Sequence, residues 1–199
     1  MSANDALYPE PPDGYQPAVL LEYPRMGLQV AAIMVLACTA PLLFILAWML
    51  QRRQVANLLV DVSRVTDLVL VLVTVFLTMV IHELVHGGVY QLLGYQVTYG
   101  ISGHLFAVYA AAFDQWQTRD HNLIVALAPL VVLTLMLVPL LAVQSHIVVL
   151  LALTALLMNI GGAVGDLYLT WRLLRLPRAA LLYDVTPKIM LIYEPTAQE

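Results

Sequence analysis

The chain has 199 residues, of which 61% are hydrophobic and only 11% are charged. An ordinary soluble domain carries roughly a quarter charged residues, so this composition excludes a soluble globular protein and predicts a polytopic membrane protein. The net charge of -4 combines 13 acidic with nine basic residues. The basic residues are scattered, which excludes the concentrated positive charge of a nucleic-acid binder. The expected partner is therefore the lipid bilayer, and no nucleic acid is expected.

The first 27 residues are rich in proline, at Pro9, Pro11, Pro12, Pro17 and Pro24. Proline removes a backbone N–H and interrupts regular structure, so we expect residues 1–27 to form a flexible N-terminal arm. A recognition segment is the alternative, since extended Pro-rich stretches bind aromatic grooves. The transmembrane domain would then span residues 28–176, and residues 177–199 would form a C-terminal tail.

Four apolar blocks follow the arm, and each reaches the roughly 17 residues that a membrane-spanning helix needs. They are Leu28–Leu50, Leu68–Leu93, Leu123–Val143 and Ile147–Trp171. We expect each block to form one transmembrane helix, and we number these predicted helices one to four in chain order.

The segment between predicted helices two and three has a different pattern. Apolar residues occupy alternate positions, and Gly94, Gly100 and Gly103 interrupt the segment. Such alternation indicates a half-buried strand, so we expect a re-entrant or interfacial β-like hairpin that turns near Gly103. A fifth helix over residues 95–113 is the alternative. The predicted fold class is an all-α polytopic membrane protein with four transmembrane helices and this hairpin.

Basic residues in the loops predict the orientation, because cytoplasmic loops carry an excess of Lys and Arg. With a cytoplasmic N-terminus, six basic residues lie inside, and only Arg52, Arg53 and Arg64 lie outside. We therefore expect both termini in the cytoplasm. Arg52 and Arg53 directly follow predicted helix one and favour the opposite orientation, which stays open as the alternative.

Predicted helix two contains the sequence His82-Glu83-Leu84-Val85-His86, an H-E-x-x-H motif. Residues i and i+4 lie on one helical face about one turn apart, so the two imidazoles can bind one Zn²⁺ ion. Glu83 can then reach a zinc-activated water as general base. In the alternative reading, His82, Glu83 and His86 only hydrogen-bond one another or lie at the membrane edge.

A catalytic zinc site usually has three protein ligands, and predicted helix four offers the third. Asp166 is the only carboxylate of its block, and Asn159 lies seven residues earlier on nearly the same face. Helices two and four would run in the same direction, which places His86 and Asp166 each roughly 27 to 29 Å from the starts of their helices. Three glycines between Asn159 and Asp166 would allow close approach of the backbones. Ordinary glycine packing, with Asp166 extending to the membrane surface, is the alternative.

These pieces together resemble a known class of enzymes. Residues 81–87, the step Ala128-Pro129-Leu130 and residues 159–166 are similar to the site-2 protease class of intramembrane zinc metalloproteases. They resemble more closely the zincin peptidase family of small bacterial membrane proteins, over roughly residues 68–171. The resemblance implies a bacterial cell membrane and a hairpin that presents the substrate as an extended strand. It also implies site roles: zinc ligands His82, His86 and Asp166, the base Glu83, and Asn159 as a contact to the substrate backbone or oxyanion.

We therefore hypothesise an intramembrane zinc metalloprotease with one zinc ion per chain and an active site toward the cytoplasm. Its substrate would be a transmembrane segment of another protein, cut by a zinc-activated water with Glu83 as general base. A metal-binding or metal-transporting membrane protein is the first alternative, although predicted helices one and three offer few polar residues for a transport path. The second alternative is an inactive protein that binds membrane segments.

Overall fold

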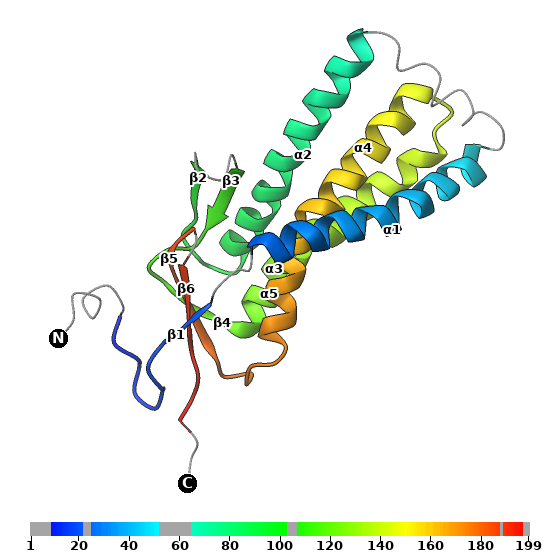
Figure 1. The fold of residues 1–199 in the computed structure, drawn as a ribbon. Helices are drawn as coiled ribbons and strands as arrows, with labels where there is room; N and C mark the ends of the chain where they lie inside the picture. Colours follow the sequence, from blue (N-terminus) through cyan, green and yellow to red (C-terminus); the bar gives the residue numbers. More distant parts are fainter. Residues whose placement is uncertain (1–8, 22–24, 52–64, 103–106, 188, 197–199) are drawn as a thin grey trace.

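The computed structural model of the protein describes residues 9–21, 25–51, 65–102, 107–187 and 189–196. Its helices form an elongated bundle, and its strands gather at one end of that bundle (Figure 1). The helices are α1 (Arg25–Gln51), α2 (Val65–Leu92), α3 (Arg119–Leu137), η2 (Val138–Ala142), α4 (His146–Gly162) and α5 (Val164–Leu173).

Four helical stretches are long and apolar enough to cross a membrane, namely Gly27–Met49, Thr66–Leu92, Arg119–Ala142 and His146–Leu173. Four spanning stretches, as the sequence predicts, are thus confirmed by length and composition. Large apolar side chains on their outer faces, such as Leu72 and Phe76 of α2, are more than half exposed. Such faces suit contact with lipid rather than water.

The fourth spanning stretch is not the single helix that the sequence predicts. It divides at Ala163 into α4 and α5, and α5 continues in a changed direction (Figure 1) while it still packs against α3. Gly161 and Gly162 come directly before the break, and glycine lowers the stability of a helix interior. The break matters because it lies between the two candidate site residues of this stretch.

The prediction of an all-α fold with one hairpin is incomplete, because the structure also contains a four-stranded sheet. Its order is β1 (Val19–Leu21), β6 (Ile189–Tyr193), β5 (Leu181–Thr186) and β4 (Trp116–Thr118). All three pairings are antiparallel. Strand β1 lies within the predicted flexible arm and β5 and β6 lie within the predicted tail, so the two ends of the chain meet in one sheet.

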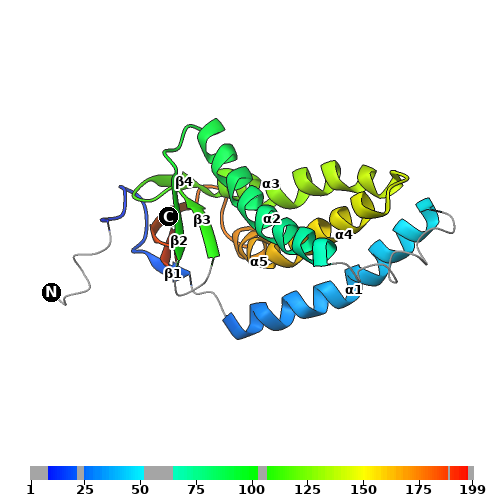
Figure 2. The same cartoon turned by 90° about the horizontal axis from the view of Figure 1, so that it is seen from above.

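The predicted hairpin between the second and third spanning helices is present as strands β2 (Thr98–Ser102) and β3 (Ala107–Ala111). They pair antiparallel from Thr98 with Ala111 to Ser102 with Ala107. The predicted turn at Gly103 lies outside the described residues, and so do Arg52, Arg53 and Arg64. The hairpin packs beside the second half of α2, near the end of the bundle that carries the sheet (Figures 1 and 2).

Two apolar clusters tie these parts together. One joins α1 to α4 and η2 around Ala47, Leu141 and Leu156. The other joins the sheet to α3 and α5, with Leu21, Leu182 and Ile192 packed against Ala126 and Leu173. The sheet therefore holds the end of the bundle at which α2, α3 and α5 meet, while α1 lies along one flank (Figure 2).

Candidate metal centre

Helix α2 carries His82 and His86 on one face, as the motif predicts. Each residue is only 7% exposed, and the two ring centroids lie 4.9 Å apart in an edge-on arrangement. The spacing of four residues corresponds to about one helical turn, so both rings point to the same side of α2. Two buried imidazoles in a spanning helix are costly unless they have polar partners.

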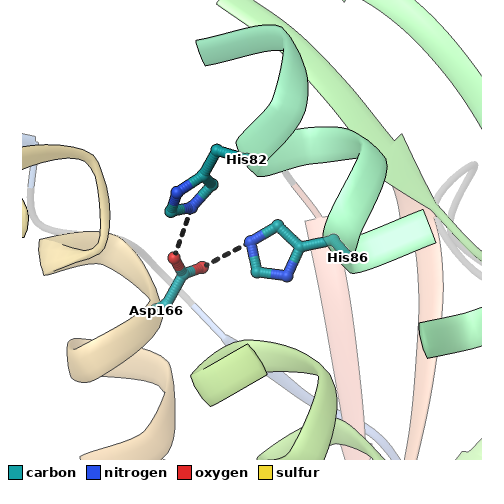
Figure 3. A group of neighbouring side chains, drawn as sticks. All are labelled: His82, His86 and Asp166. Carbon is teal, nitrogen blue, oxygen red and sulfur yellow. Dashed lines mark hydrogen bonds and ion pairs between the residues drawn. The ribbon is translucent and has the colours of Figure 1, made fainter. Parts of the chain in front are cut away.

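Asp166 supplies such a partner from the first turn of α5. Its Oδ2 lies 3.2 Å from Nε2 of His82, and its Oδ1 lies 3.5 Å from Nε2 of His86 (Figure 3). One ligand atom from each of the three residues lies within 4.8 Å of the others. The structure therefore brings together the three residues predicted as metal ligands, and we call them the metal group.

The other ring nitrogen of His86 is held by the backbone of α3. Nδ1 lies 2.9 Å from the carbonyl oxygen of Val125, and a carbonyl can only accept, so Nδ1 carries the proton. This carbonyl is free because Pro129, four residues later inside α3, has no N–H to close the usual helical hydrogen bond. The proline thus creates the acceptor that orients His86.

Asn159 of α4 holds His82 in a similar way. Its Oδ1 lies 2.9 Å from Nδ1 of His82 and accepts the proton of that nitrogen. The same amide is 1% exposed, and its Nδ2 has no hydrogen-bond partner among the described residues. Asn159 was predicted to contact substrate, and the structure adds a contact that orients a histidine.

These contacts allow a test of whether the metal group suits a cation. With the proton on Nδ1, a neutral imidazole presents a lone pair at Nε2. Both Nε2 atoms face oxygens of the Asp166 carboxylate, and three electron-rich groups repel one another unless a positive charge lies among them. Two imidazole nitrogens and a carboxylate oxygen are a typical zinc ligand set, and the partners at Nδ1 are the usual support for such ligands. The residues present therefore fit a zinc ion.

Glu83 lies beside the metal group and touches the hairpin. Its Oε2 accepts a hydrogen bond of 3.0 Å from the backbone N–H of Ala110 in β3. In the ladder, Ala110 stands opposite Tyr99 of β2. Strand β3 is thereby fixed next to the predicted general base.

Gly87 leaves room for the side chain of Tyr99, from β2, to lie against α2. A Cβ atom at this position would meet the hydroxyl group and ring of Tyr99, with ring carbons only 2.6 Å away. At the neighbouring Gly88, a Cβ atom would meet nothing within 4 Å. Of these two glycines, only Gly87 lies so close to the hairpin that an added Cβ atom would displace a neighbouring side chain.

Arg119 fixes the far end of the short helix that carries Asp166. This first residue of α3 is 8% exposed, and its Nε donates to the carbonyl oxygen of Leu173, the last residue of α5, at 2.9 Å. Such a bond satisfies a C-terminal carbonyl that has no partner within the helix. Helix α2 carries the two histidines and α5 carries Asp166, and each of these helices is hydrogen-bonded to α3.

Sequence reasoning missed a polar network beside the metal group. Gln117 donates to Asp184 at 3.0 Å and to the carbonyl of Ala112 at 2.8 Å. Asn122 donates to Gln117 and accepts from the hydroxyl group of Tyr90. Asp184, Gln117 and Asn122 are all buried. The only sequence signal for this network is Asp184 itself, a lone acid within the apolar strand Leu181–Thr186.

A cavity of about 220 Å³ connects the metal group with this network. It is lined by Glu83, His86 and Asp166 and also by Tyr90, Asn122 and Asp184. Burial raises the pKa of Asp184 from 3.8 to about 6, although the hydrogen bond from Gln117 opposes the rise. Asp184 therefore adds a third carboxyl group to the cavity, beside Glu83 and Asp166.

Comparison with known proteins supplies the family. No curated protein and no solved structure matches the chain. Residues 75–181, just over half of the chain, match the sequence model of one family, described as "Putative zincin peptidase". The match includes the H-E-x-x-H motif, the hairpin, Pro129 and the segment from Asn159 to Asp166. The chain therefore belongs to this zincin peptidase family.

Proposed function

We propose that the protein is an intramembrane zinc metallopeptidase that hydrolyses peptide bonds in segments of other membrane proteins. Family membership indicates a zinc metallopeptidase. The observation that carries the proposal is the convergence of His82, His86 and Asp166, with both histidines already donating through Nδ1. One zinc ion would be held by these three side chains.

When bound, zinc would polarise the scissile carbonyl group and lower the pKa of a water molecule. Glu83 neighbours His82 on the same helix and would accept the proton of the attacking water on its carboxylate. It would then transfer this proton to the leaving nitrogen. The buried Nδ2 of Asn159 is a donor without a partner among the described residues, which supports a contact to the substrate carbonyl or oxyanion.

The position of the site supports a membrane segment as substrate. His82 and His86 lie within the spanning stretch Thr66–Leu92, and Asp166 lies within His146–Leu173. A helical segment must unwind before a peptidase can reach its backbone, because its N–H and C=O groups are already paired in lipid. Strand β3 beside Glu83 would replace these hydrogen bonds by pairing with the unwound segment. The resemblance to site-2 proteases supports the same arrangement.

The cavity on the membrane side of the site favours hydrolysis over metal transport. It measures about 340 Å³ and lies between α2, α3 and α4. Thr74 and Thr78 are the only polar residues among the described residues that line it, and Thr78 donates its hydroxyl proton to the carbonyl of Thr74. A metal ion that left His82 in this direction would find no carboxylate, imidazole or thiolate there. This feature disfavours a transit site, because a dehydrated cation needs such ligands.

The basic residues of the loops favour an active site on the cytoplasmic side, and the resemblance to a family of small bacterial membrane proteins supports a bacterial cell membrane. Arg119 directly follows β4, Arg172 lies in the last turn of α5, and Arg175 and Arg178 lie between α5 and β5. All four are therefore close in sequence to the sheet.

Replacing Glu83 by Gln tests the proposed function directly. The protein would be reconstituted in liposomes with a panel of reporter proteins, each containing one transmembrane segment, and cleavage would be followed by gel electrophoresis. Wild-type protein should cleave at least one reporter, whereas Glu83→Gln should retain its zinc and cleave none. Glu10→Gln, at an exposed position of the N-terminal region, is the matched control and should cleave normally. Cleavage that persists in Glu83→Gln would contradict the role of Glu83.

A further inference from the structure

The cavity beside the metal group is much larger than the space that the attacking water needs. Its volume of about 220 Å³ far exceeds the roughly 10–15 Å³ that one buried water occupies. Beyond the metal group its lining includes Tyr90, Asn122 and Asp184. A space of this size beside a peptidase centre can receive a side chain of the substrate.

Asp184 is an unusual residue to line such a space. Asp184 belongs to β5 and is 7% exposed, and its carboxylate accepts a hydrogen bond from the neutral amide of Gln117. No Lys or Arg occurs among the described residues that line the cavity. The pKa of about 6 leaves Asp184 mostly ionised at neutral pH. A buried carboxylate without a cationic partner is costly, and a cationic ligand in the cavity would offset this cost.

The negative charge of the cavity lining indicates which kind of side chain the cavity can bind. Glu83, Asp166 and Asp184 contribute three carboxylates to the lining, and a bound dication would offset only two of these charges. An anionic side chain would be repelled there. An apolar side chain would displace water from Asp184 and give its carboxylate no hydrogen bond in exchange. A cation would satisfy the carboxylate by a charge-assisted hydrogen bond.

We propose that this cavity is a side-chain subsite of the peptidase and that it takes a basic residue, lysine or arginine, whose cationic group binds Asp184. The proposal rests on the proposed peptidase function. Asp184 would be a specificity residue that acts on the side chain of the substrate, apart from the chemistry at Glu83. It lies outside residues 75–181, so the preference would belong to this chain rather than to the matched part of the family.

The polar network gives the subsite a fixed geometry. Gln117 is fully buried and is held on both sides, because it donates to Ala112 and accepts from Asn122. The same Nδ2 group of Asn122 also lies 3.3 Å from the carbonyl of Thr118. Gln117 therefore presents its N–H to Asp184 from a constrained position, and the carboxylate is oriented before any ligand binds.

Two small zinc-binding probes test this subsite. Nα-acetyl-lysine hydroxamate and Nα-acetyl-norleucine hydroxamate share a zinc-binding group and a four-carbon side chain, and only the lysine compound has the ammonium group. Both would be titrated calorimetrically into the zinc-loaded full-length protein in detergent. The lysine probe should bind the wild type at least roughly tenfold more tightly, as expected for a charge-assisted contact. Asp184→Asn should remove this preference and leave the affinity for the norleucine probe unchanged.

The outcomes separate the subsite from the peptidase function. Equal affinity of the two probes for the wild type would overturn the subsite while the zinc site stands, and this comparison needs no variant. Binding of neither probe would contradict a zinc ion that is open to ligands in this cavity, and it would overturn the proposed peptidase function together with the subsite. Asp120→Asn changes a carboxylate that is 60% exposed on α3 and should keep the preference. A preference that survives in Asp184→Asn would assign the cation to a different group and contradict the proposal.

Discussion

The imidazole of His86 donates its Nδ1 proton to the carbonyl oxygen of Val125, which lies 2.9 Å away on α3. In an uninterrupted helix this carbonyl would accept the N–H of residue 129, but residue 129 is proline. A proline within a spanning helix therefore has a specific role here, since it frees one acceptor at the position that His86 requires. Pro129 thus helps to orient His86, although it is not itself part of the metal group.

Pro129→Ala should weaken zinc binding. The restored N–H would compete with His86 for the carbonyl of Val125, and loss of such an outer contact typically costs about tenfold or more in metal affinity. Competition with a chromophoric chelator measures this affinity. Pro41→Ala removes the proline within α1, a helix that carries none of the metal group, and serves as control. Equal zinc affinity in the two variants would show that the freed carbonyl does not matter.

Two substitutions at Asn159 should separate its two contacts. Asn159→Asp keeps an oxygen that accepts from His82 but removes the N–H₂ group. It should therefore retain zinc and lose most of the hydrolysis, by roughly 10²-fold if Nδ2 contacts the oxyanion. Asn159→Ala removes both groups and should lower zinc affinity as well. Zinc content and reporter cleavage, measured on the same preparations, distinguish these effects. Full activity of Asn159→Asp would exclude a role for Nδ2 in catalysis.

Gly87→Ala should disturb the site through the hairpin. The added methyl group would collide with the ring of Tyr99 and displace this side chain. Because Tyr99 stands opposite Ala110 in the hairpin, we expect the displacement to weaken the contact between Ala110 and Glu83. We expect reduced hydrolysis with zinc retained. Gly88→Ala adds the same methyl group in open space and should remain active. Reporter cleavage by the two variants checks this prediction, and equal activity would mean that the hairpin adapts without cost.

The raised pKa of Asp184 predicts a pH-dependent stability. Because the folded value of about 6 lies above the unfolded value of 3.8, the folded state binds the proton more tightly. Asp184 therefore destabilises the protein increasingly as pH rises from about 4 to about 6, by up to roughly 3 kcal/mol. Asp184→Asn should raise the melting temperature at pH 7 and change it little at pH 4. Thermal unfolding of wild type and variant at both pH values tests this, with Asp120→Asn as control. A variant that is less stable at pH 7 would contradict the expected sign.

The sequence was most informative where one physical constraint dominated. Apolar length identified the four spanning stretches, and the i, i+4 spacing with matching helix depths led to His82, His86 and Asp166. The alternating apolar residues between the second and third spanning stretches indicated a hairpin rather than a fifth helix, and strands β2 and β3 confirm the hairpin.

The sheet and the polar network could not be predicted, because they depend on contacts between residues that are far apart in the sequence. Strand β1 spans only three residues and pairs with β6, about 170 positions away, so neither local pattern revealed the sheet. The same limit applies to Asp184, which reaches the cavity only after β5 pairs with β4 and β6. The roles of Val125 and Pro129 depend on how α3 packs against α2, which helical periodicity does not specify.

Zinc content per chain tests the central claim most directly. Mass spectrometry of detergent-purified wild-type protein should find about one zinc ion per chain, as expected for a single three-ligand site. His86→Ala and Asp166→Ala, which remove ligands from two different helices, should each lose most of it. A folded wild-type protein that binds no zinc, or an Asp166→Ala variant that retains the full amount, would contradict a metal centre formed by α2 and α5.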